Sequence, residues 1–126
     1  MPQNQKSLTS ILPVYIDSYE LLKYMLVLIK NMPRDVKFIY GMDLKNQSFL
    51  LVANIYFATV SKNDKINYIN SALSNIKFIN LMIRVTKDLN FVKDKQYYGT
   101  INLTGKINKQ LKAWKYSIVD RQNNNR

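Results

Sequence analysis

The side chains of this chain that could do chemistry are charged ones, because the sequence contains no histidine and no cysteine. Its eight Asp and Glu residues are scattered without a close pair, so neither acid–base catalysis nor a carboxylate metal site is indicated. Gly41, Gly99 and Gly105 are isolated, which excludes a glycine-rich phosphate loop. We therefore expect no enzyme activity, no metal and no cofactor.

Basic residues offer the other kind of chemistry, which is the binding of polyanions. Nineteen Lys and Arg residues give the 126-residue chain a net charge of +11. Such a field attracts nucleic acid or anionic lipid over about a Debye length, ~8 Å at physiological salt. From Phe91 onward, eight basic residues accompany two acidic ones, so this region carries +6 of the total. The candidate binding residues are Lys77, Arg84, Lys95, Lys106, Lys109 and Lys112.

Four helices are expected to position these residues, because apolar residues recur at spacings of three and four nearly everywhere. The predicted helices cover residues 13–30, 38–60 and 65–89, and a fourth runs from about 93 past 114. Short turns between long helices require alternating directions, so the predicted fold is all-α, an up-down-up-down antiparallel four-helix bundle. We expect a polar segment over 1–12, the bundle over 13–119 and a basic, Asn-rich tail over 120–126, disordered from Gln122.

Two of the predicted helices carry two apolar stripes each. In the first helix, Tyr15, Tyr19, Leu22, Leu26 and Ile29 are predicted to form the packed seam, with Leu21, Met25, Leu28 and Met32 alongside. In the second helix, one stripe is Phe38, Met42, Phe49, Ala53, Tyr56 and Val60, and the other is Leu44, Leu51, Ile55 and Ala58. Helices three and four each have one inward stripe, centred on Ile76 and Ile107.

The third helix has a spare apolar arc in its second half, opposite its inward stripe. Phe78, Leu81, Met82, Val85 and Leu89 form this arc, and the first four are the candidate interface residues. Either the helix ends wrap a wide core, or the arc packs, together with the double stripes of helices one and two, against other copies of the chain in a homo-oligomer. Most of the nine tyrosines share positions with Leu and Ile and are expected in the core. Tyr97 and Tyr98 are the exception, because adjacent residues point to different faces.

A membrane location is not favoured by the sequence. The longest nearly apolar run covers residues 49–60, well short of the ~18 apolar residues needed to span a bilayer. The first ten residues are polar and lack a targeting signal, so a cytoplasmic location is expected. A basic helical protein resting on anionic membrane stays an alternative, weakened because the apolar stripes match bundle seams.

Five segments carry a resemblance to a known family. They are Leu12-Pro13-Val14-Tyr15, Met32-Pro33-Arg34-Asp35, Gly41-Met42-Asp43-Leu44-Lys45, Ile83-Arg84-Val85-Thr86-Lys87-Asp88-Leu89 and Leu111-Lys112-Ala113-Trp114-Lys115. In order and spacing they resemble the accessory variability determinant (Avd) proteins of diversity-generating retroelements. The resemblance adds Lys87 and Lys115 to the candidate binding residues. Met32 stands where the family usually has Phe, and Phe57 where a basic residue is common.

The resemblance implies a non-enzymatic four-helix bundle that assembles into a basic homopentameric ring. Its partners would be a reverse transcriptase and RNA or DNA, in support of error-prone cDNA synthesis during mutagenic retrohoming. The related bundle proteins encoded in intervening sequences of ribosomal RNA genes share the stretch from Gly41 to Asn54-Ile55. Those proteins typically continue with Ala-Glu-Gly, whereas this chain continues Tyr56-Phe57-Ala58. The retroelement hypothesis is therefore preferred.

Overall fold

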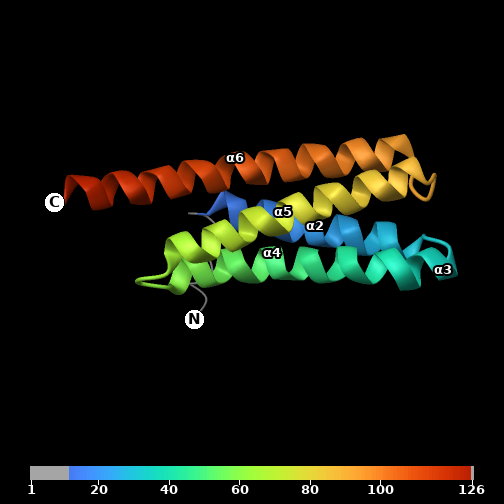
Figure 1. The fold of residues 1–126 in the computed structure, drawn as a ribbon, viewed down its shortest axis with the longest axis horizontal. Helices are drawn as coiled ribbons and strands as arrows, with labels where there is room; N and C mark the ends of the chain where they lie inside the picture. The colour runs from blue at the N-terminus through green and yellow to red at the C-terminus, as the bar shows by residue number, and fades with distance from the viewer. Residues whose placement is uncertain (1–11, 126) are drawn as a thin grey trace.

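Four long helices form the molecule, and the computed structural model describes residues 12–125. They are α2 (Pro13–Lys30), α4 (Met42–Val60), α5 (Lys65–Asp88) and α6 (Asp94–Asn124). Successive long helices run in opposite directions (Figure 1). Helix α4 packs against α2 and α5, and α6 packs against the same two helices, which places the four in a square in chain order. The predicted antiparallel four-helix bundle is confirmed; of the polar segment predicted over 1–12, all but Leu12 lies outside the described residues.

The helical segment that contains α4 begins at Arg34, earlier than the predicted start at residue 38, because two short helical elements precede α4. Helix α3 (Arg34–Val36) follows Pro33, and a π-helical turn, η1 (Lys37–Gly41), joins it to α4 without a break. Gly41 lies where α2 comes close, since a Cβ at this position would stand 2.9 Å from Ile29 Cγ2. Glycine here allows the two helices to approach.

The turn between α5 and α6 is fixed by the backbone. Asn90 has a φ of 64°, in the left-handed region that ends many helices. The N–H of Phe91 donates to the carbonyl oxygen of Thr86 at 2.8 Å, which closes the end of α5. The Gln96 side chain then accepts from the N–H of Lys93 at 2.8 Å and starts α6. Asn90 thus lies directly after the helix that was predicted over 65–89, and its left-handed backbone ends that helix.

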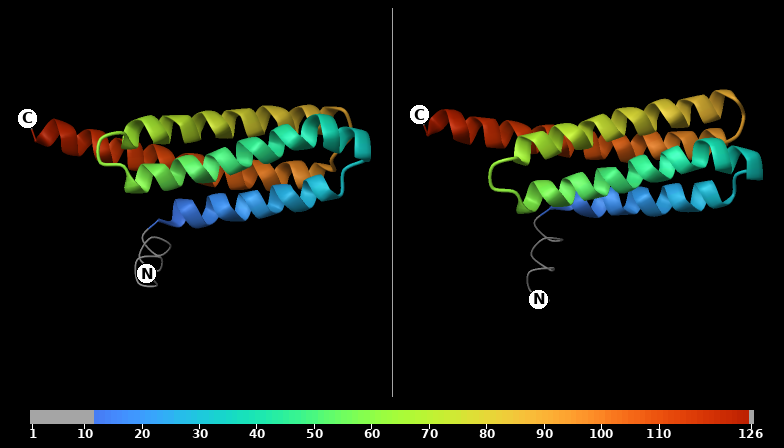
Figure 2. Two further views of the ribbon diagram at one scale, coloured as in Figure 1. Left: turned by 90° about the horizontal axis from the view of Figure 1, so that it is seen from below. Right: turned by 60° about the horizontal axis from the view of Figure 1, so that its bottom comes forward.

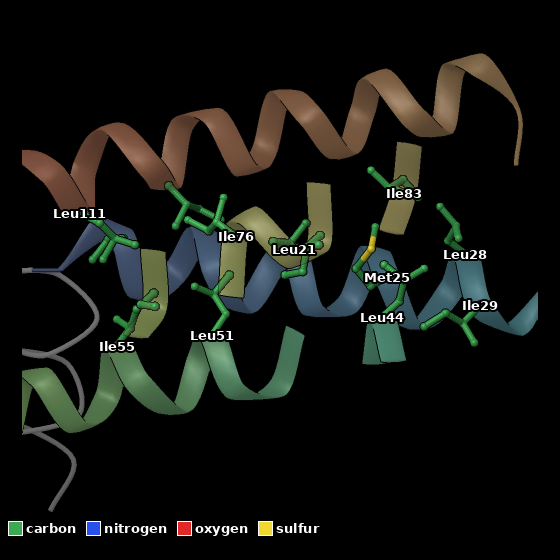
Figure 3. Packing of buried hydrophobic residues seen from close by; sticks show 14 of the residues in the cluster. Leu21, Met25, Leu28, Ile29, Leu44, Leu51, Ile55, Ile76, Ile83 and Leu111 are labelled. Atoms are coloured by element: carbon green, nitrogen blue, oxygen red, sulfur yellow. The ribbon is translucent and has the colours of Figure 1, made fainter. Parts of the chain in front are cut away.

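The core lies along the axis of the square, and each long helix contributes to it. Side chains of all four helices point into the space between them (Figure 3). Fully buried members include Leu21, Met25, Leu44, Leu51, Ile55, Ile79, Ile83, Ile107 and Leu111. The α4–α5 seam also holds a polar ladder, in which Asn54 donates to Asn75 at 2.8 Å and Asn75 donates to Gln47 at 2.9 Å. A satisfied polar ladder of this kind favours one alignment of the two helices.

The predicted seam of the first helix is partly wrong. Leu22 and Ile29 are buried, but Tyr19 and Leu26 are exposed. In α4, the Leu44 stripe is buried, whereas five of the six residues of the Phe38 stripe are exposed and Ala53 is half-buried. A helix in a four-membered square buries one arc, so the second apolar stripe faces outward.

Helix α6 is longer than its neighbours, with 31 residues against 24 in α5. Its C-terminal turns extend past the rest of the bundle (Figures 1 and 2). The predicted disordered tail is wrong over 122–124, because the helix continues to Asn124. Buried Ile118 keeps the helix packed up to the last turns, and the polar residues after it are compatible with a solvated helix. Arg126 lies outside the described residues.

Candidate functional site

A lysine-rich surface covers the outer side of α6. Lys95, Lys109 and Lys112 are exposed and lie within an arc of about 100°, at about 100° per residue. This arc is opposite buried Ile107 and Leu111. From Lys95 to Lys115 the helix carries five lysines and no acidic residue. We call the exposed surface formed by Lys95, Lys109, Lys112 and the residues between them the basic face.

Lys106 borders the basic face, and Lys115 lies outside it. At about 100° per residue, Lys106 lies about 20° from Lys95 on the side toward α2, and its ammonium is 3.5 Å from Asp17 Oδ1. The same carboxylate, whose side chain is only 15% exposed, accepts a hydrogen bond from Gln110 Nε2 at 2.6 Å. Lys115 is half-buried. Lys106 is thus an edge residue whose charge is partly offset by Asp17, and Lys115 is separated from the other predicted lysines of α6.

Helix α5 places further basic residues next to α6. Lys77 and Arg84 are exposed, and they flank Asn80, whose Oδ1 accepts from Thr104 Oγ1 of α6 at 2.7 Å. Since seven residues complete nearly two turns, Lys77 and Arg84 share the edge of α5 that borders α6. The basic residues of the two helices therefore lie on neighbouring surfaces, as α5–α6 packing requires.

The end of the bundle near the α5–α6 turn groups cations with tyrosines. Hydrogen bonding to Tyr97 and to Asp88 raises the pKa of Arg84 above its ordinary value, so its guanidinium stays charged. Arg84 Nε lies 3.2 Å from both Asp88 carboxylate oxygens. The Lys87 ammonium lies 4.9 Å from the Tyr97 ring centroid and 5.8 Å from that of Tyr98. The positive charge of Arg84 is thus partly offset by Asp88, while the Lys87 ammonium lies over two tyrosine rings.

A second surface is apolar and lies on the outer sides of α4 and α5. Its residues are exposed large hydrophobic side chains: Met42, Phe49, Leu50, Tyr56, Phe57 and Val60 on α4, and Phe78 and Leu81 on α5. We call it the apolar surface. The Phe57 ring packs 5.5 Å from that of Tyr68, which links the two helices. Of the predicted interface residues, Phe78 and Leu81 are exposed, whereas Met82 and Val85 are half-buried, with Met82 packed against the core.

The sequence offered the double stripe of the second helix for contact between copies, but no α4 residue was named as an interface residue. A signal was available, because residues 46–60 contain no charged residue in a chain where 21% of residues are charged. Phe57, which replaces a basic residue common in the resembling family, belongs to this surface. The departure from the family pattern therefore extends an apolar surface.

Neither surface carries the groups of a catalytic centre. Among residues 12–125, no cluster of three or more acidic, histidine or cysteine side chains could hold a metal ion. Within the same residues, no helix is long and apolar enough to cross a bilayer. What the described arrangement offers chemically is cation–anion attraction on one side and apolar contact on another.

An antiparallel four-helix bundle with a lysine-rich face and a separate apolar surface belongs to the class of all-α bundle proteins. Within that class, the family model described as bAvd-like matches residues 12–118. The match covers most of the sequence, and the chain belongs to the bAvd-like family. The resemblance found in the five sequence segments is thereby confirmed. A search of curated protein sequences returned no match.

Proposed function

We propose that this chain is a non-catalytic accessory protein of a diversity-generating retroelement, which binds the element's template RNA and its reverse transcriptase. Membership of the bAvd-like family supports this role. The chain has no polymerase aspartate motif, so cDNA synthesis would belong to the partner enzyme. The accessory protein would hold the RNA and present it during error-prone cDNA synthesis.

The basic face is the observation that carries the RNA-binding proposal. Three exposed lysines on one helix side, with no acidic residue between Lys95 and Lys115, are spread over about 26 Å of helix length at 1.5 Å per residue. This spread suits an extended polyanion better than a small anion. Each phosphate that they neutralise releases condensed counterions, which gives affinity without base recognition. Binding of this kind is salt-sensitive and weakly sequence-selective.

The apolar surface supports the proposal that copies of the chain associate with one another, as the pentameric ring of the resembling family requires. A protomer with a charge of +11 repels its copies. Repulsion is weakest where two protomers meet through a surface without charge, and residues 46–60 supply one. A closed ring needs two different patches on each protomer. The exposed apolar residues of α2, including Ile16, Tyr19 and Val27, offer the second patch.

Fluorescence anisotropy with labelled single-stranded RNA tests the RNA-binding proposal. The log of the association constant should fall linearly with the log of salt concentration, with a slope of about −0.7 per phosphate contact. An affinity that does not depend on salt, or no binding at low salt, would exclude the basic face as a polyanion site.

Co-purification with the reverse transcriptase of the same retroelement tests the second partner. The two proteins should elute together, and cDNA synthesis on the template RNA should require the accessory protein. A reverse transcriptase that elutes alone and synthesises the same cDNA without this chain would overturn the accessory role.

A further inference from the structure

Two exposed tyrosines mark the basic face. Tyr98 is 57% exposed and Tyr116 is 68% exposed, unlike the tyrosines packed against the core. They are eighteen residues apart, which is five complete turns, so both lie on one line of α6 about 27 Å from each other. Lys109 and Lys112 lie between them on the same side of the helix. Two lysines therefore lie between two tyrosines along one exposed helix surface.

The ring of Tyr98 is held in place by its neighbours. Tyr97 packs against the core and meets Tyr98 nearly edge-on, at 5.2 Å between ring centroids and an interplanar angle of 75°. Lys87 adds a cation 5.8 Å from the Tyr98 centroid. An oriented aromatic ring loses little conformational freedom when it stacks on a ligand. Tyr98 is thus an exposed and positioned stacking surface.

Gly105 lies on the same side of α6 between the two tyrosines and leaves the helix backbone there without a covering side chain. Glycine inside a helix is unfavourable by roughly 1 kcal/mol relative to alanine. A Cβ at Gly105 would meet no atom within 4 Å, so core packing does not explain the glycine. Its position between Tyr98 and Lys109 lets a ligand approach the helix backbone closely.

We propose that the outer face of α6 binds single-stranded nucleic acid, with bases stacked on Tyr98 and Tyr116 and phosphates neutralised by Lys109 and Lys112. This inference rests on the proposed function and names the form of nucleic acid that is bound. In a duplex the base faces are already stacked within the helix, and only a single strand can offer them to tyrosine. Every base has an aromatic face, so stacking tolerates any sequence.

The double variant Tyr98→Ala, Tyr116→Ala tests the proposal against oligo(U) and oligo(dT), with a duplex of mixed sequence as the second ligand. Single-strand affinity should fall about tenfold per tyrosine, in line with measured base–aromatic stacking. Duplex affinity should stay within about twofold. The log–log salt slope should be unchanged, because no charge is removed. The variant Tyr98→Phe, Tyr116→Phe should bind single strands like the unmodified protein.

Phe38→Ala is the matched control. Phe38 is an aromatic residue of η1 that is 82% exposed and lies outside both the basic face and the apolar surface. Its replacement should leave nucleic-acid affinity unchanged.

Three results would overturn the inference. They are an unchanged single-strand affinity in the double alanine variant, an equal loss for single strand and duplex, and a loss of reverse-transcriptase binding while RNA binding is retained. Salt-dependent binding by the unmodified protein together with any of these results leaves the proposed function standing. If the unmodified protein binds neither form of nucleic acid, both proposals fail.

Discussion

Helices α4 and α6 each bury one stripe of side chains in the core, but their outer surfaces differ in charge. Leu51 of α4 and Leu111 of α6 are both fully buried. On its outer side, α4 has no charged residue over 46–60, whereas α6 carries five lysines from Lys95 to Lys115. The inner stripe of each helix therefore forms the bundle, while the outer stripe sets the charge and polarity of its surface.

Replacement of a core residue should have the largest effect on stability. Leu51→Ala removes a fully buried side chain and should lower the free energy of unfolding by roughly 2–5 kcal/mol. Leu50→Ala is the matched control on the outer stripe, since Leu50 is 48% exposed, and it should cost less than about 1 kcal/mol. Urea denaturation at low protein concentration measures both. Equal losses would mean that the two stripes of α4 are not distinguished by burial.

Charge placed on the outer stripe of α4 should separate protomers. The double variant Phe49→Asp, Phe57→Asp puts two carboxylates on the apolar surface, where a contacting copy would leave them desolvated. We expect a monomer by light scattering at tens of micromolar, with the helical circular dichroism spectrum retained. Phe49→Leu, Phe57→Leu should keep the assembly. If the aspartate variant keeps its mass, copies do not meet through α4.

Glycines on the inner and outer sides of the bundle should respond in opposite directions to alanine. Gly41→Ala places a methyl group 2.9 Å from Ile29 Cγ2 and should lower stability by roughly 1–3 kcal/mol. Gly105→Ala meets open space and should raise stability by roughly 0.5–1 kcal/mol. Thermal melts followed by circular dichroism check both signs. A gain of stability for Gly41→Ala would contradict the placement of Gly41 against α2, and a loss for Gly105→Ala would contradict the open space at Gly105.

The smallest expected effect is that of pH. The chain contains no histidine and no cysteine, the side chains whose ordinary pKa values lie closest to neutral pH. Hydrogen bonding to Tyr97 and Asp88 raises the pKa of Arg84, so its charge is present below that pKa and lost only above it, in strong alkali. RNA affinity should therefore be flat from pH 6 to 9. An anisotropy titration with a step near neutral pH would point to a binding group other than the basic face.

Much of the fold could be predicted from the sequence, because helical spacing and the turn residues around Pro33 and Asn90 are local signals. The sequence does not indicate which of the two apolar stripes of α4 faces inward, since Phe49 and Leu51 are both apolar and only tertiary packing distinguishes them. The same holds for the end of α6, where a polar segment is compatible with either helix or disorder.

The candidate site was predictable in part. Lys109 and Lys112 are exposed on the side of α6 opposite Ile107, as expected from their spacing in a helix. The pairing of Lys106 with Asp17 joins residues far apart in the chain, so no local pattern indicates it. The stacking surface depends on the exposure of Tyr98 and Tyr116, which the apolar spacing alone does not reveal.

Sedimentation velocity with labelled single-stranded RNA tests most directly whether the two outer surfaces have separate roles, because it reports assembly mass and bound RNA in one sample. The variant Lys95→Gln, Lys109→Gln, Lys112→Gln alters the basic face, and Lys23→Gln, Lys30→Gln, Lys62→Gln removes the same charge from exposed positions elsewhere. The first variant should keep the unmodified assembly mass, bind RNA more weakly and lose up to ~2 from its log–log salt slope, while the control loses less. Unchanged binding and slope in the first variant, or loss of its assembly, would contradict separate surfaces for nucleic acid and self-association.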